Sequence, residues 1–458
     1  MTSESLTGIL ARRIAQPVDP RARRRAVLHW IDWMGCVAAG ARAPVGAVLR
    51  AWQRTPGRPR ATPSLLGLAE DDYHALLCDA GPANVEEMDD MHRAAILHPG
   101  PAVIPALAGV ARRHRLSAAQ TLDALVRGYE VMIRIGRAVG PRHYFFWHNT
   151  ATVGAFGAAA ACASALGLGE EPTVWALGNA GTQAAGLWQV RLEPVMSKQL
   201  HTAHAAWSGM TAASLAAAGF TGPAFILEGE RGFLKAMCEG ADAAAITRAE
   251  SDWLIHDTSF KPWPACRHTH ATIDCVLALR DAEGGVPLAF EHGVVEGFGD
   301  AVAICNNPRP TTRTEAKFSL QYAVAATAQF GLLRPEHFDA EVFTRPAFAP
   351  AMQRVELRVG ADISARYPAH YGARVTLTLA GGRTVVHEVR DSLGDPERAL
   401  PEAAVLDKAR ALFAYGGVAP ARAEAALASA RALLDGAADS AGPVPPALLD
   451  PLFPEPTA

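Results

Sequence analysis

Histidines, lysines and acids gather in four polar segments of an otherwise apolar chain. The first segment reads EEMDDMHRAAILHPG (residues 86–100), with Asp90, His92 and His98 in it. A solvated acidic turn before a proline-started helix would show the same pattern. If His98 instead stands at the helix N-terminus, its imidazole lies beside backbone N–H groups that favour anions. The segment is therefore a candidate carboxylate site, with Asp90 and His92 beside it.

The second segment, HYFFWHN (residues 143–149), places His143 and His148 just before a run of alanine and glycine. A histidine in such a place commonly does no more than bind a loop carbonyl. The aromatic neighbours would also exclude water, which a proton-transfer residue requires. His148 is therefore a candidate for proton transfer.

The third segment, SKQLHTAHAAWSG (residues 197–209), contains one of only five lysines among 43 basic residues. At helical spacing, Lys198, His201 and His204 share one face of a helix. A surface lysine beside two core histidines would give the same pattern. The alternative is a cationic site in which Lys198 and His201 face a substrate.

The fourth segment, FKPWPACRHTH (residues 260–270), lies where the sequence pattern changes, and ligand sites favour junctions between domains. A proline-stiffened linker with exposed charges is the simpler interpretation. Lys261 and Arg267 could instead bind a substrate. Cys266 is the one cysteine in cationic surroundings, which can lower the pKa of a thiol and make it reactive.

Other kinds of site find little support in the sequence. His92 and His98 lack the i, i+4 spacing of a helical zinc pair, and we see no other set with ligand spacing. The sequence has neither a phosphate loop nor a dinucleotide fingerprint after a strand, and it lacks a nucleophile elbow. We therefore expect no metal and no organic cofactor.

The secondary structure that positions these residues is predicted to change from helices to strands along the chain, and back to helices at its end. Up to about residue 260 the apolar residues follow a helical period, and Ser117 with Gln120 forms a capping-box signal. The alanine- and glycine-rich stretch 150–169 fits a buried helix better than a membrane span. Alternation in 353–360, and in 374–390 around a Gly-Gly turn, predicts strands and a hairpin. The tail is helical again.

This pattern predicts a mainly α fold in two domains. We expect a large all-α helical domain built from both chain ends, residues 1–262 completed by 395–458, and a smaller α+β lid domain at 263–394. The formal net charge of −3 argues against nucleic acid and acidic membranes as partners. The opening residues lack a signal-peptide pattern, so we expect a cytoplasmic protein. The seven scattered cysteines are expected to be free thiols.

Taken together and in this order, the segments resemble the MmgE/PrpD family, which includes 2-methylcitrate dehydratase, cis-aconitate decarboxylase and iminodisuccinate epimerase. The resemblance rests on EMDDMHRAAILHPGPAVIPAL, WHNTATVGAFGAAAA, SKQLHTAHAAWSGMTAASLAAAGFTGP, FKPWPACRHTHATID and FSLQYAVA, among other pieces. It implies a homodimer of two-domain subunits, with the pocket between the domains and neither metal nor organic cofactor.

The resemblance also implies catalytic roles for a set of five residues, namely His98, His148, Lys198, Lys261 and Tyr322. Two positions depart from the family's decarboxylases, which have aspartate where Glu87 stands and a second histidine where Cys266 stands. The cysteine makes a decarboxylase less expected. The segment LHPGP also differs from the longer G-H-P-S-D-N type of the methylcitrate dehydratases.

Dehydration, epimerisation and decarboxylation beside a carboxylate all need a base, a proton donor and cations for the developing charge. We therefore predict a cofactor-independent lyase that acts on a small di- or tricarboxylate through an enediolate, in the manner of a 2-methylcitrate dehydratase. The alternatives are an epimerase of an iminodisuccinate-type substrate and a decarboxylase of a cis-aconitate-type acid. A non-catalytic polycarboxylate-binding protein is the alternative from a different class.

Overall fold

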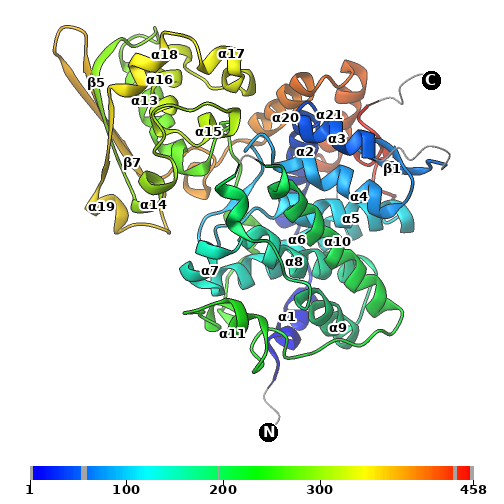
Figure 1. Ribbon diagram of the computed structural model, residues 1–458. Coiled ribbons are helices and arrows are strands. Elements are labelled where there is room, and N and C mark those ends of the chain that lie inside the picture. The colour runs from blue at the N-terminus through cyan, green and yellow to red at the C-terminus, as the bar shows by residue number, and fades with distance from the viewer. Residues whose placement is uncertain (1–3, 53–58, 194, 437–440, 454–458) are drawn as a thin grey trace. The chain divides into compact units, whose positions relative to one another are not determined.

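The computed structural model describes residues 4–52, 59–193, 195–436 and 441–453 of the chain (Figure 1). It divides into two compact units. The helical unit comprises Met1–Val85, Asp89–Thr258 and Pro401–Ala458, and the mixed unit comprises Glu86–Met88 and Ser259–Leu400. Helices dominate and the sheets are small, so the predicted mainly α fold is confirmed.

The helical unit starts with helices and short strands that extend to the first polar segment: α1 (Leu6–Ile14), α2 (Pro20–Gly40), α3 (Pro44–Trp52), β1 (Thr62–Ser64), β2 (Gly67–Ala69), α4 (Asp72–Ala80), η1 (Gly81–Asn84) and β3 (Met91–His92). The long helices follow: α5 (Gly100–His114), α6 (Ala118–Ala138), α7 (Gly140–Phe146), α8 (Asn149–Ala165), α9 (Glu170–Gly181), η2 (Trp188–Arg191) and α10 (Ser197–Ala217). Short elements and the C-terminal helices complete it: α11 (Phe233–Met237), α12 (Ala244–Thr247), η3 (Leu254–Asp257), α20 (Glu402–Gly416), α21 (Pro420–Leu434) and η8 (Pro446–Leu448).

Helix α8 forms the centre of the helical unit. Its residues from Asn149 to Ala163 are all buried, and it packs against α5, α6, α9 and α10. Small side chains allow this close approach, because a Cβ on Gly209 of α10 would lie 2.4 Å from the Cβ of Ala158. Among the described residues, no helix combines the length and apolarity needed to cross a membrane. The alanine-rich stretch is a core helix.

A local signal in the sequence accounts for the start of α6, and a long-range contact holds α20. Ser117 caps α6 by accepting from the backbone N–H of Gln120, and the Gln120 side chain accepts from the backbone N–H of Ser117. The predicted capping box is therefore confirmed. The C-terminal helix α20 returns to pack against α2, where the Lys408 ammonium lies 2.6 Å from the buried Asp32 carboxylate.

The mixed unit is built on a four-stranded sheet of order β6-β5-β7-β8. Strands β5 (Phe290–Gly297) and β6 (Val355–Val359) are parallel, whereas β7 (Ala373–Leu379) is antiparallel to both β5 and β8 (Thr384–Val389). Strands β7 and β8 form the predicted hairpin, and Gly381 and Gly382 take positive φ angles at its turn.

Helices pack against this sheet in the mixed unit. Helix α13 (His270–Ala282) packs on β7 and β8, and α16 (Leu320–Phe330) packs on α13. Shorter elements connect them: β4 (Thr258–Ser259), which begins on the last residue of the helical unit, η4 (Arg267–Thr269), α14 (Gly299–Ile304), α15 (Arg313–Lys317), η5 (Pro335–Phe338), α17 (Ala340–Phe343), α18 (Phe348–Gln353), α19 (Ala361–Ser364) and η6 (Pro396–Arg398).

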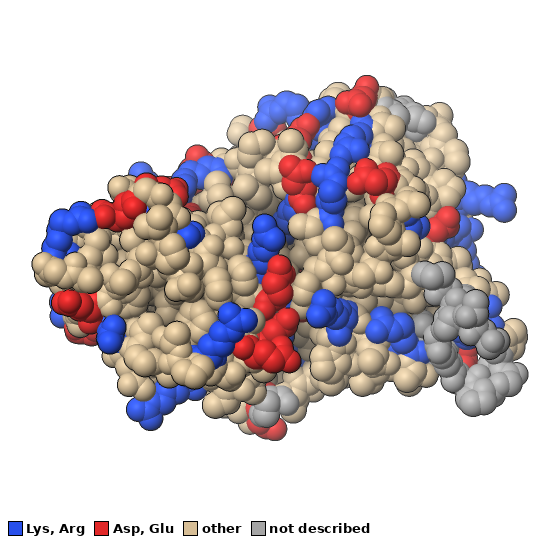
Figure 2. Space-filling model, turned by 90° about the horizontal axis from the view of Figure 1, so that it is seen from above, with Lys and Arg blue, Asp and Glu red and all other residues tan. Residues whose placement is uncertain are grey.

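The face drawn in Figure 2 carries charges of both signs. On the face drawn in Figure 2, acidic and basic side chains are interspersed, in keeping with the formal net charge of −3. Nucleic-acid binding depends on a concentrated basic surface. The face in Figure 2 does not present one.

Candidate active site

A buried carboxylate fixes the loop that leads into α5. Asp90 accepts through Oδ1 from the backbone N–H of Gly100, at 2.9 Å, where α5 begins. Its Oδ2 accepts from the Tyr129 hydroxyl at 2.6 Å and lies 2.7 Å from His29 Nδ1. Burial lowers the pKa of His29 to about 4, so its ring is neutral near neutral pH. Helices α2, α5 and α6 thus hold the loop at three points.

His98 lies on this loop with its ring position determined by two acceptors. Its Nδ1 lies 2.8 Å from the backbone oxygen of Asp90 and 3.0 Å from Oδ2 of Asp89. Its backbone N–H donates to Thr150 Oγ1 of α8 at 3.1 Å. Asp89 was not among the residues predicted from the sequence, although it adjoins Asp90. The sequence pattern that could have identified Asp89 is the pair of adjacent acids shortly before a histidine.

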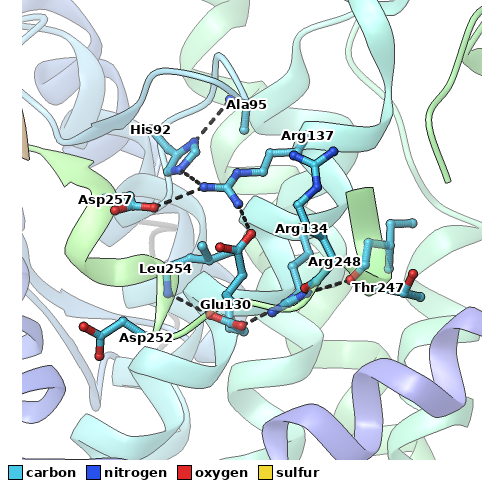
Figure 3. Close-up of polar contacts among 12 residues, drawn as sticks. His92, Ala95, Glu130, Arg134, Arg137, Thr247, Arg248, Asp252, Leu254 and Asp257 are labelled. Atoms are coloured by element: carbon cyan, nitrogen blue, oxygen red, sulfur yellow. Dashed lines mark hydrogen bonds and ion pairs between the residues drawn. The ribbon is translucent and has the colours of Figure 1, made fainter. Parts of the chain in front are cut away.

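His92 contacts Ala95 and Arg137 (Figure 3) and stabilises the turn that precedes His98. Its Nδ1 accepts from the backbone N–H of Ala95 at 3.2 Å, and its Nε2 lies 3.4 Å from the Arg137 guanidinium. Arg137 also pairs with Glu250 at 2.7 Å and with Asp257 at 3.1 Å. Burial, followed by the Arg137 charge, lowers the pKa of His92 far below its ordinary value. The structure thus gives His92 contacts that support the loop.

His148 occupies the N-cap position of α8 without a capping bond from its side chain, and it is almost fully buried. Its backbone N–H donates to the Gly186 carbonyl at 2.9 Å, and its ring lies against Trp188 with the centroids 4.3 Å apart. The Nδ1 atoms of His148 and His201 are 3.4 Å apart. Burial lowers the pKa of His148 well below its ordinary value, and the nearby Lys198, His201 and His98 lower it further.

The first turns of α10 bring Lys198 and His201 towards His148. Lys198 is half-buried, and its charge acts on both histidines. Burial lowers the pKa of His201, with smaller contributions from His204 and Lys198. His204 itself is exposed and lies 3.4 Å from the Gln183 carbonyl. Of the three residues on the predicted helical face, Lys198 and His201 therefore lie near His148, whereas His204 faces solvent.

His143, the other histidine of the second segment, has structural partners. Its Nδ1 lies 2.9 Å from the Met237 carbonyl, and its Nε2 lies 2.8 Å from Thr152 Oγ1. This matches the simpler interpretation of a histidine that binds a loop carbonyl. The helical unit therefore brings together His98, His148, Lys198 and His201, while His92 and His143 support the surrounding backbone.

Lys261 belongs to the mixed unit and is completely buried there. Its Nζ lies 3.2 Å from Oε2 of Glu87, whose φ of 55° is unusual for a residue with a side chain. The neighbouring Glu86 pairs with Lys317 at 2.6 Å and with Arg313 at 2.7 Å. In the mixed unit, the adjacent Glu86 and Glu87 thus each pair with a lysine. Lys317 is a further buried lysine that the sequence had not suggested as a site residue.

Arg267 and Cys266 occupy the same unit. Arg267 is paired with the buried carboxylate of Asp395. The Cys266 thiol is buried, and its backbone N–H donates to the Lys317 carbonyl at 3.0 Å. A hydrogen bond from Cys305 lowers the pKa of Cys266, and the charge of Lys261 is only a small contribution. The main cause is thus a neighbouring thiol and not the cations that the sequence suggested. All seven cysteines are free thiols, as expected.

Tyr322 lies in an apolar cluster of the mixed unit. Its hydroxyl donates to the His337 carbonyl, and its ring packs edge-on against Phe338, Phe343 and Phe348. Burial raises the pKa of Tyr322 above its ordinary value. The hydroxyl is thus used within the fold of the mixed unit.

Two groups among the described residues come close enough to hold a metal ion: Asp19 with Asp252 and His256, and His370 with Asp391 and Glu397. Neither group includes a residue of the candidate site. In the second, His370 Nε2 lies 2.8 Å from the Arg390 guanidinium, a cation that would repel a metal ion.

Comparison with known proteins covers both units. The MmgE/PrpD N-terminal domain model matches residues 4–246, and the MmgE/PrpD C-terminal domain model matches residues 263–434. The chain is 27% identical to cis-aconitate decarboxylase of Homo sapiens over 333 residues, which cover 69% of this chain and 67% of that protein. It is 26% identical over 328 residues to the cis-aconitate decarboxylase-like protein oryM of Aspergillus oryzae, covering 65% and 67%. A cis-aconitate decarboxylase of Aspergillus terreus is 25% identical over 282 residues, covering 58% and 56%.

Proposed function

Because the chain belongs to the MmgE/PrpD family, we propose that it is a lyase which acts on a small di- or tricarboxylate through an enediolate. The observation that carries this proposal is the group formed by His98, His148, His201 and Lys198 in the helical unit. Several imidazoles and an ammonium gathered around a buried position suit an anionic substrate and a proton transfer.

The chemistry assigns a role to each kind of group. A proton beside a carboxylate is far less acidic than any side chain, so a base removes it only if cations stabilise the enediolate as it forms. His98 or His148 is the candidate for proton transfer. Lys198 and Lys261 are the candidates for charge stabilisation. We assign no part to Tyr322, because its hydroxyl proton is donated to His337.

We favour dehydration as the reaction. The base takes the proton from the carbon beside the carboxylate, the C–O bond of the neighbouring hydroxyl breaks, and hydroxide leaves as water with a proton from a second group, for which the Lys198 ammonium is the candidate. The buried thiol of Cys266, where the family's decarboxylases have histidine, supports this choice over decarboxylation. Epimerisation of an iminodisuccinate-type acid is the alternative that needs the same base.

A decarboxylase of a cis-aconitate-type acid is the second candidate. The relatives described above carry that activity in their names, and they match more than half of the chain. This reaction would release carbon dioxide and place a solvent proton on the substrate carbon. Product analysis separates it from dehydration, which conserves every carbon atom.

The test is incubation of the purified protein in D₂O with citrate-, aconitate- and aspartate-type acids, followed by proton NMR. A dehydratase produces or consumes a vinyl proton, a decarboxylase loses carbon dioxide, and an epimerase exchanges the proton at a stereogenic carbon. A protein that binds an acid but neither converts it nor exchanges its protons would be a binding protein, and the proposed lyase would be wrong.

We further propose that turnover needs no added metal. The site residues are imidazoles and ammonium groups, which supply the base and the cations by themselves. Prolonged treatment with EDTA should leave turnover unchanged. Complete loss that one divalent ion restores would show that the histidines had been misinterpreted.

We also propose that the protein is a homodimer. The helical unit leaves large apolar side chains exposed, among them Leu187, Leu192, Val195, Met196 and Leu200. A cluster of this kind is typical of an interface between protein chains. These residues flank Lys198 in sequence, so a second copy seated there would cover the start of α10.

A further inference from the structure

The histidines of the helical unit differ in the charges that face them. His98 faces the carboxylate of Asp89 and the backbone oxygen of Asp90. His148 faces His201 and Lys198, and the charge of His98 also acts on it. One imidazole therefore has an anion at its side, whereas the other is surrounded mainly by groups that are neutral or positive.

The partners of His98 determine which of its nitrogens carries hydrogen. A carbonyl oxygen and a carboxylate oxygen can only accept, so Nδ1 must donate to them. In the neutral ring, Nε2 then carries the lone pair and is the atom able to take a proton. When it does so, the ring becomes a cation 3.0 Å from the Asp89 carboxylate, which stabilises it.

His148 is in the opposite situation. Only one hydrogen fits between its Nδ1 and the Nδ1 of His201, so the two rings cannot both be cations. Asp89 acts on His148 in the favourable direction, but more weakly than Lys198, His201 and His98 act against it. Burial is the main reason that the pKa of His148 lies well below its ordinary value, and these charges lower it further, so the ring remains neutral. A neutral imidazole donates one hydrogen bond without carrying an extra proton.

We propose that His98 is the base of the reaction, that Asp89 is its positioning residue, and that His148 is a neutral hydrogen-bond donor to the substrate. This assignment rests on the lyase proposed above. In the step, the C–H bond beside the carboxylate breaks, its electron pair stays with the substrate as the enediolate, and the proton moves to Nε2 of His98. Asp89 keeps its charge in this step, and the proton from Lys198 is transferred only later, when hydroxide leaves.

The orientation of His98 can be tested without any turnover. NMR of the full-length protein with ¹⁵N-labelled histidine, with the His98 signals assigned by their loss in His98→Asn, reports which ring nitrogen carries hydrogen. We expect hydrogen on Nδ1 in the neutral ring. A signal from the Nε2–H form would overturn the assignment, and this holds even if the protein converts none of the acids tried, so the two proposals can fail separately.

The role of Asp89 is tested by Asp89→Asn, which keeps the shape and removes the charge. We expect kcat to fall by about ten- to a hundredfold with KM changed by less than about threefold, and the acidic limb of the kcat profile to move to lower pH. Asp391→Asn is the matched control, since Asp391 is a buried acid 2.6 Å from His370 in the other unit. An unchanged kcat and pH profile in folded Asp89→Asn would refute the role of Asp89.

Glutamine variants separate the two histidines, because an amide donates a hydrogen bond but is not a base. His148→Gln should recover activity to within about tenfold of the wild type, well above His148→Ala. His98→Gln should stay at least about a hundredfold below the wild type. The reverse order, with His98→Gln active and His148→Gln inactive, would show that the roles are exchanged.

Discussion

Two polar segments of the helical unit are built in contrasting ways. The segment from Asp89 to Gly100 is held by contacts within this chain, with Asp90 bonded to α2, α5 and α6. The segment from Leu187 to His201 instead exposes large apolar side chains, and Leu192 is 80% exposed. Exposed apolar surface is costly in water. The contrast indicates that His98 is positioned by the fold alone, whereas the surroundings of Lys198 would be completed by the second chain of the homodimer proposed above.

The largest expected effect is the loss of the base. His98→Asn keeps a polar side chain of similar shape but cannot accept a proton from carbon, so kcat should fall by roughly 10²–10⁴. Steady-state kinetics on the acid that the wild type converts would measure this. His74→Asn is the control, since His74 also pairs with an aspartate, at 2.8 Å, in the same unit. Equal losses in both variants would show that His98 has no special role.

Lys198→Ala and His148→Ala address the second segment. Each removes a group expected to stabilise the developing charge, and each should lower kcat by about a hundredfold while the protein stays folded. Lys235→Ala removes an exposed lysine of the same unit and should leave kcat unchanged. Near-wild-type turnover in both folded site variants would show that His148 is only a core histidine and Lys198 only a surface lysine.

The anchoring of the first segment predicts a dependence of stability on pH. Because the pKa of His29 is about 4 in the folded protein, the unfolded chain binds a proton there at higher pH than the folded chain does. The neutral, buried His29 therefore contributes to the free energy of unfolding fully above about pH 6.5, and this contribution is lost as the pH falls towards 4. The free energy of unfolding should fall by about 2 kcal/mol between about pH 8 and pH 5 because of His29.

Urea unfolding of the wild type and of His29→Gln at several pH values would measure this contribution. The difference between the two proteins isolates His29 from other buried groups such as Asp32, whose pKa burial raises to about 6 and whose effect has the opposite sign. A difference in unfolding free energy that does not change with pH would contradict the neutral, buried state of His29.

The smallest effect concerns assembly. Leu192→Asp combined with Leu200→Asp places charges on the exposed apolar segment and should shift a dimer towards monomer in sedimentation at micromolar concentration. Val386→Asp changes an exposed apolar residue of the mixed unit and should leave the mass unchanged. A wild-type protein that sediments only as a monomer would count against the proposed homodimer.

The sequence predicted much of the fold because local patterns determine it. The capping box at Ser117, the buried alanine-rich α8 and the Gly-Gly hairpin each depend on residues close together in the chain. The segments that carry His98, His148 and Lys198 were found for the same reason.

The partners of these residues could not be predicted, because they come from distant positions. Asp90 meets Tyr129 across 39 residues, and Glu86 meets Lys317 across 231. The hydroxyl of Tyr322 bonds a carbonyl 15 residues away, and only the structure shows this use of it. Asp89 is closer to its histidine, but the sequence does not say which acid of the pair faces the ring.

Deuterium exchange tests the central claim most directly. The wild type and His98→Gln would each be incubated in D₂O with the di- and tricarboxylic acids, and the loss of the proton beside the carboxylate would be followed by proton NMR. We predict exchange or conversion of at least one acid by the wild type, slowed by at least about a hundredfold in the variant. No exchange of any acid by the wild type, or equal rates in the two proteins, would contradict it.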